Sequence, residues 1–105
     1  MKKEEIEVYS HDTNGAIVRM PERHFPGVVM QGDSLSTMFY DLMAALEGAE
    51  GKVDRNTFLS ILEQAQAVEA HLLHYEATLR KHGIQIPYDR DPMRSTMKYR
   101  KYWEK

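Results

Sequence analysis

The sequence contains no cysteine, and this absence removes several chemistries at once. A disulfide framework, a thiolate zinc site and a cysteine nucleophile all require thiols and are excluded. No apolar run approaches the length of a membrane span, and no apolar segment follows the lysines at positions 2 and 3. We therefore expect a soluble, cytoplasmic protein that has neither a secretory leader nor a membrane partner.

Size and charge limit the number of domains and the kind of partner that the protein can have. The 105 residues, of which 42% are hydrophobic and 29% charged, correspond to one small domain without room for a deep enclosed cleft. Residues 1–87 hold eight Lys/Arg and thirteen Asp/Glu, whereas residues 88–105 hold six and three. The acidic body and the basic tail bear on the choice of partner more than on the fold.

Alternating polar and apolar residues predict three short strands, at about residues 5–10, 16–20 and 28–30. Asn14 and Gly15 between the first two are typical of a hairpin turn. A three-residue loop at 13–15 would pair Val8 with Met20 and put both on one buried face with Val18. We expect this register, with Gly15 in the left-handed region of a bulge.

Two stretches show helical spacing of apolar residues. The first follows Gly32 and is expected to end at Gly48 to Gly51, with apolar positions at Leu35, Met38, Phe39, Leu42, Met43 and Leu46. The second spans residues 55–82 and ends at Gly83. The second stretch carries an apolar seam of Phe58, Ile61, Ala65, Val68, Leu72, Tyr75 and Leu79. The pattern predicts an α+β fold in which a three-stranded antiparallel sheet packs on an antiparallel two-helix hairpin. Residues 1–88 would form this domain and residues 89–105 a basic, aromatic tail.

The run Gly32-Asp33-Ser34-Leu35-Ser36 resembles the first block of the GDSL hydrolases, whose serine is the nucleophile. That family's later Asp-x-x-His is missing here, and a serine without a positioned base is an ordinary hydroxyl. Asp33 or Ser34 as the N-cap of the first helix explains the same residues. An anion site at Gly32, Asp33 and Ser34 is a further alternative, although the Asp33 carboxylate would compete with the anion.

The histidines do not form a recognisable ligand set. His71 and His74 are three residues apart on the second helix and could share a metal, but no third ligand completes the site. We expect exposed histidines, no metal and no cofactor.

The long seam needs more cover than the first helix can provide. Either residues 84–103 fold back over it, or a second copy of the chain covers it in a homodimer. The tail could also bind single-stranded nucleic acid through its aromatic and basic residues, but the acidic body argues against that. A protein-binding surface is therefore expected at the tail and the helix end, formed by Leu72, Tyr75, Leu79, Arg100, Tyr102 and Trp103.

The run Phe25-Pro-Gly-Val-Val-Met-Gln-Gly-Asp-Ser-Leu35, together with His82 to Tyr88, resembles a small bacterial domain of unknown function. The resemblance covers most of residues 5–88 and implies a bacterial origin but no activity.

Three functions follow from these observations. The first is a non-catalytic protein-binding module, such as a toxin-neutralising immunity protein or a regulator, whose acidic body suits a basic partner. The second is a small hydrolase centred on Ser34, and the third is a nucleic-acid-associated regulator that uses the tail.

Overall fold

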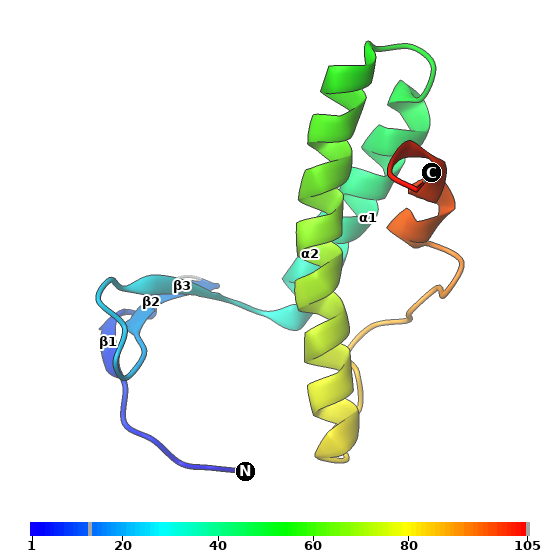
Figure 1. Cartoon of the computed structure of the whole chain (residues 1–105). Coiled ribbons are helices and arrows are strands. Elements are labelled where there is room, and N and C mark those ends of the chain that lie inside the picture. Colours follow the sequence, from blue (N-terminus) through cyan, green and yellow to red (C-terminus); the bar gives the residue numbers. More distant parts are fainter. Residues whose placement is uncertain (13, 105) are drawn as a thin grey trace.

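The computed structural model describes residues 1–12 and 14–104 and confirms the α+β class (Figure 1). A three-stranded antiparallel sheet precedes a two-helix hairpin whose second helix is the longer. The strands are β1 (Glu7–Ser10), β2 (Gly15–Arg19) and β3 (Gly27–Met30). The helices are α1 (Gly32–Ala49), α2 (Arg55–Lys81) and a 3-10 helix, η1 (Thr96–Tyr102).

In the sheet, β2 is the middle strand, with β1 and β3 antiparallel on either side. The predicted pairing of Val8 with Met20 is wrong, because Val8 lies opposite Val18 and a bulge follows before Ser10. The error is a shift of two residues, so Val8, Val18 and Met20 still share a face, since side chains alternate with a period of two. The expectation that this face is buried is also wrong, because only Val18 of the three is buried. Thr13, in the expected loop, lies outside the described residues, so the loop conformation stays a prediction.

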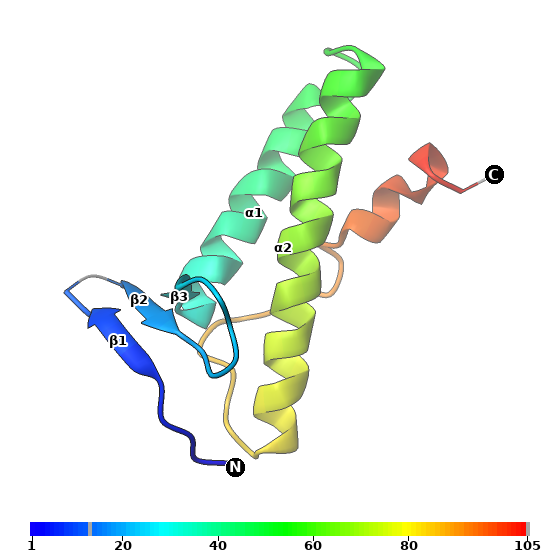
Figure 2. The same ribbon diagram turned by 60° about the vertical axis from the view of Figure 1, so that its left-hand side comes forward.

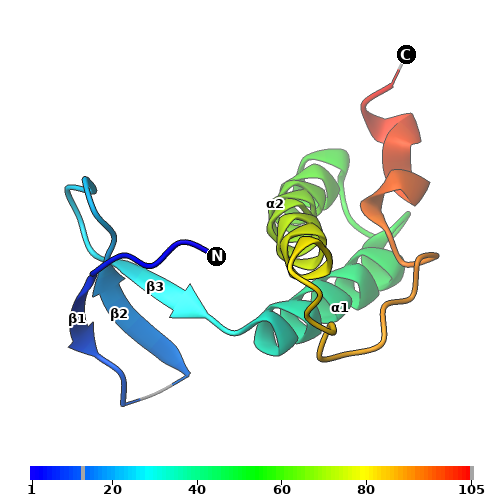
Figure 3. The same cartoon turned by 90° about the horizontal axis from the view of Figure 1, so that it is seen from below.

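The sheet projects from the side of the hairpin (Figures 1 and 3), so the expected packing of the sheet on the hairpin is wrong. A single residue, Gln31, separates β3 from α1, and its backbone is extended, with φ −67° and ψ 147°. The chain therefore runs directly from the last strand into the first helix. At this joint the ring of Tyr75 lies so close to Gly32 that a Cβ there would overlap with it.

The hairpin core lies along one seam of α2. Its buried residues are Phe58, Leu62, Ala65, Glu69, Leu72 and Glu76. They meet Phe39, Met43 and Leu46 of α1, which are fully buried as the helical spacing predicted. Ile61, Val68, Tyr75 and Leu79, which we placed in the seam, are only partly buried. The seam thus includes two glutamates. The first helix, α1, ends at Ala49, between the two glycines that we expected to end it, and Gly51 has a φ of 77°.

The C-terminal tail packs on the hairpin, which confirms that it folds back on the chain. The short helix η1 lies beside α2, on the side of the hairpin away from the sheet (Figures 2 and 3). Tyr99 is 1% exposed and belongs to the hydrophobic core, where its ring meets Phe58 edge-on at 5.5 Å. Lys98 and Lys101 pair with Glu47 and Glu50 at 3.3 Å, so the basic tail neutralises part of the acidic body.

Glu69 and Glu76 are 7% and 2% exposed, and a buried carboxylate is costly unless it is hydrogen-bonded or paired. Glu76 accepts a hydrogen bond from the Tyr88 hydroxyl at 2.7 Å and faces the Arg90 Nε at 3.4 Å. Glu69 accepts hydrogen bonds from the hydroxyl and the backbone N–H of Thr96. The segment after α2 therefore supplies the partners that these two seam carboxylates require.

Tyr88→Phe should lower the free energy of unfolding by about 1–3 kcal/mol, because it leaves the Glu76 carboxylate buried with one partner fewer. Tyr99→Phe is the matched control. The Tyr99 hydroxyl is buried without a hydrogen-bond partner in the described part of the chain, so its removal should leave stability unchanged or raise it. Urea unfolding of the two variants measures both effects, and an equal loss in both would contradict the assigned contacts.

The alkaline limit of stability should also depend on Tyr88. Burial, and then the hydrogen bond to Glu76, raise the pKa of Tyr88 above its usual value of 10.0. A pKa raised by folding contributes stability below about pH 10 that is lost as the pH rises through the folded-state pKa. Tyr88→Phe should flatten the decline above pH 10 by up to about 1.4 kcal/mol per pH unit. An unchanged slope in denaturant titrations at stepped pH would contradict this contribution.

Candidate functional site

The segment Gly32-Asp33-Ser34 lies within the first turn of α1. The N-cap is Gln31, without a side-chain cap, so our prediction of Asp33 or Ser34 as the cap is wrong. The Asp33 carboxylate instead accepts the backbone N–H of Ser34 at 2.9 Å, a donor that a bound anion would need. No hydrogen bond joins Ser34 to a histidine among the residues described, whereas serine hydrolysis uses such a pair.

His71 and His74 are exposed on α2. Within residues 1–12 and 14–104, no group of three or more His, Asp or Glu side chains is placed to hold a metal ion. None of the helices in the same residues is long and apolar enough to cross a membrane.

The expected surface at the tail and the helix end is not one surface. Leu72 is fully buried, Tyr75 packs on Gly32, and Leu79 lies near the C-terminal end of α2. The tail residues lie at the other end of α2, where the Tyr102 carbonyl accepts a hydrogen bond from Arg55 at 3.2 Å. The Tyr102 hydroxyl donates to Glu50 at 2.8 Å, whereas Arg100 is exposed and Trp103 is 41% exposed. The structure therefore separates Leu79 from Arg100, Tyr102 and Trp103.

Another apolar surface lies on the sheet, where sequence reasoning did not place a binding surface. We call it the sheet surface, and it consists of Val8, Met20, Phe25, Val28, Val29 and Met30, which are 44–77% exposed. Val18 alone is buried among the apolar residues of the strands. A signal was present in the sequence, because the consecutive apolar residues of β3 must point to both faces of a sheet.

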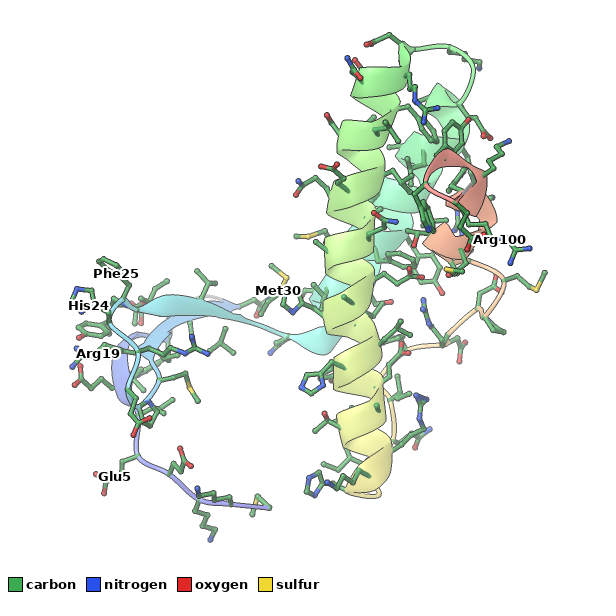
Figure 4. All side chains as sticks on the ribbon, viewed as in Figure 1. Glu5, Arg19, His24, Phe25, Met30 and Arg100 are labelled. Carbon is green, nitrogen blue, oxygen red and sulfur yellow. The ribbon has the colours of Figure 1, made fainter. Side chains whose placement is uncertain are left out.

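The sheet surface therefore has two sides. Val29 lies opposite Ala16, on the face of Val8, Val18 and Met20, whereas Val28 lies opposite Ile17 on the other face. On the first face, Met20, Phe25 and Val29 help to line a hollow of about 290 Å³. Phe25 stacks edge-on with His24, and Figure 4 shows the pair at the end of the sheet remote from the hairpin.

A charged rim borders this apolar hollow. A second hollow, of about 450 Å³, shares Met20 and Arg23 with it and is also lined by Glu5 and Glu22. Arg19 pairs with Glu7 across the strands, with its Nε 3.1 Å from Oε2. That contact and the Tyr9 hydroxyl lower the pKa of Glu7. Glu5 and Glu22 make no ion pair in the described chain, so their charges remain available.

The turn that holds Glu22 is strained. The Arg23 N–H donates to the Met20 carbonyl at 3.1 Å, which closes a turn with Pro21 at its second position. Glu22 follows with φ +67°, a conformation in which glycine is usual. This turn presents the Glu22 carboxylate at the same end of the sheet as Phe25.

The C-terminal end of α2 is also partly uncovered and carries the opposite charge. Leu73 and Ile84 are 48% and 55% exposed, and a hollow of about 310 Å³ is lined by Met1, Thr78, Leu79, His82 and Ile84. Arg80 and Lys81 are exposed beside it, and the two carboxylates of residues 64–88, Glu69 and Glu76, are buried. The exposed part of this helix end is therefore apolar and basic.

Comparison with known proteins identifies a domain but no activity. The model of a family described as "Family of unknown function (DUF6959)" matches residues 1–88, which confirms the resemblance to a domain of unknown function. No curated protein and no solved structure matches the chain. The matched residues include the sheet surface and both long helices, whereas Arg90, Thr96 and Tyr99 lie beyond them.

The joint between the sheet and the hairpin can be tested with Gly32 and Tyr75. Gly32→Ala should destabilise the protein by about 1–3 kcal/mol, because the added methyl group displaces the Tyr75 ring. In a Tyr75→Ala background the same change should be neutral or stabilising, since alanine favours the helix over glycine. A double-mutant cycle from urea unfolding measures the coupling, and additive effects would contradict the close contact.

Proposed function

Since the chain belongs to the DUF6959 family, a family of unknown function, its role must be argued from its own residues, and we propose that it is a non-catalytic protein-binding module. The sheet surface is the binding element. The module acts by masking an apolar surface of a protein partner, as small immunity or regulatory proteins do. We also propose that the protein is bacterial and cytoplasmic, as expected from the sequence.

The observation that carries the proposal is the exposure of apolar side chains on both faces of the sheet. Phe25, Val28 and Met20 are 77%, 65% and 51% exposed. A small sheet needs an apolar face packed against something to be stable, and full burial of one such side chain contributes about 1.5–3 kcal/mol. Contiguous exposed apolar surface with a polar rim is typical of a protein interface.

The shape of the surface favours a protein over a small ligand. Small-molecule sites are concave and enclose most of the ligand. The sheet surface lies on both sides of a thin three-stranded sheet, where Val28 and Val29 point in opposite directions. Only a macromolecule could contact both sides at once.

The nucleic-acid alternative has less support, because both lysines and the core tyrosine of the short tail helix are engaged within the chain, although Arg100 and Trp103 are exposed. Lys98 and Lys101 face carboxylates of α1, and Tyr99 is buried in the core. Stacking of bases requires accessible aromatic rings beside free cations. The hydrolase alternative lacks a histidine partner for Ser34 among residues 1–12 and 14–104.

Site-specific photo-cross-linking in the native cell tests the proposal. A photoreactive residue at position 25 or 28, in the sheet surface, should give discrete protein adducts. Position 97 is the matched control, because Met97 is 52% exposed on the tail and lies outside the proposed interface. Adducts from position 97 or 103 alone would move the binding surface to the tail and overturn the proposal.

A further inference from the structure

Two uncovered apolar surfaces of this chain have complementary chemistry. One is the sheet surface. The other, which we call the helix-end surface, consists of Leu79, His82 and Ile84 at one hollow and of Arg80 and Lys81 in the same last turn. In a single chain the two do not cover each other, because the short joint at Gln31 and the contact of Gly32 with Tyr75 hold the sheet to the side (Figure 1).

We propose that, until another partner competes for it, the sheet surface of one copy docks on the helix-end surface of a second copy, and reciprocally. This inference rests on the proposed function, because it names one protein surface that the sheet fits. Phe25 is the anchor, since its ring is 77% exposed at the tip of the sheet. It enters the hollow of about 310 Å³ beside Leu79 and Ile84 on the other copy.

Charge complementarity supports a second copy as the occupant. The sheet carries unpaired Glu5 and Glu22 next to the hollow that Phe25 lines. The helix-end surface carries Arg80, Lys81 and His82, with no exposed carboxylate in residues 64–88. Docking would bring the acidic rim against the basic one, which favours this orientation over contact of like surfaces.

A two-fold dimer with a second copy of the chain can also provide the buried area that a stable interface needs. A standard interface buries roughly 1,600 Å² in total. In a two-fold dimer each contact between a sheet and a helix end occurs twice, so each has to bury only about half of that area. The six exposed apolar residues of the sheet, together with Leu79 and Ile84 at the helix end, provide the apolar centre of each contact.

A mixing experiment with the full chain tests the docking. By sedimentation velocity, the protein should have twice the 12.2 kDa mass of the chain. Phe25→Asp and Ile84→Asp should each weaken self-association by at least about 30-fold. An equimolar mixture of the two should recover dimer, because one intact sheet can still dock on one intact helix end. Val53→Asp, in the loop before α2 and 40% exposed, is the matched control and should remain dimeric.

Charge reversal provides a second test with exposed residues that should not affect folding. Glu5→Lys with Glu22→Lys should weaken the dimer, as should Arg80→Glu with Lys81→Glu. All four changes in one chain should restore the dimer, and Lys52→Glu should have no effect. A monomeric wild-type protein would overturn the inference. An Ile84→Asp variant that still dimerises while Phe25→Asp does not would also overturn it, since that result indicates contact between sheets.

The outcomes separate this inference from the proposed function. If the protein is monomeric but position 25 cross-links to a different protein, the second copy is wrong and the binding role stands. If the dimer forms as described but the only adduct from position 25 is the chain itself, self-docking stands and the masking of another protein is wrong. If neither occurs, both are wrong.

Discussion

The packing of this protein depends on two carboxylates that α2 directs into its core. Glu69 and Glu76 occupy seam positions beside Leu62, Ala65 and Leu72, where an unpaired charge would cost several kilocalories per mole. Their partners, Tyr88, Arg90 and Thr96, all come from the chain after α2. Two of the six buried seam residues are thus charged, and the C-terminal segment is the part of the chain that pairs with them.

This requirement determines which side of the hairpin is covered. The C-terminal segment lies along the side that carries the glutamates, and its Tyr99 completes the core against Phe58. The sheet lies on the opposite side, connected through Gln31, and its apolar residues have no comparable lid (Figure 3). The molecule therefore has a well-packed helical body on one side and a sheet with exposed apolar residues on the other.

The arrangement also relates the tail to the matched family. The domain model ends at Tyr88, which already provides one hydrogen bond to Glu76. Thr96 and Tyr99 lie beyond that boundary but contribute to the same core and to the same buried carboxylates. In this chain the body and the tail are thus energetically one unit, and the basic tail charges are satisfied mainly by the chain's own glutamates.

The sequence by itself determined the elements, because their signals are local: alternation for the strands, helical spacing for α1 and α2, and a basic, aromatic tail. It also identified Phe39, Met43 and Leu46 as core, since their spacing places them on one helix face. The inward direction of Glu69 and Glu76 was decided by tertiary structure, because a buried carboxylate depends on partners about 12 to 27 residues away. The exposure of the sheet was also decided by the tertiary structure. The apolar pattern of β3 is the same whether a lid exists or not, and the direction of the chain at Gln31 leaves these residues exposed in the described structure.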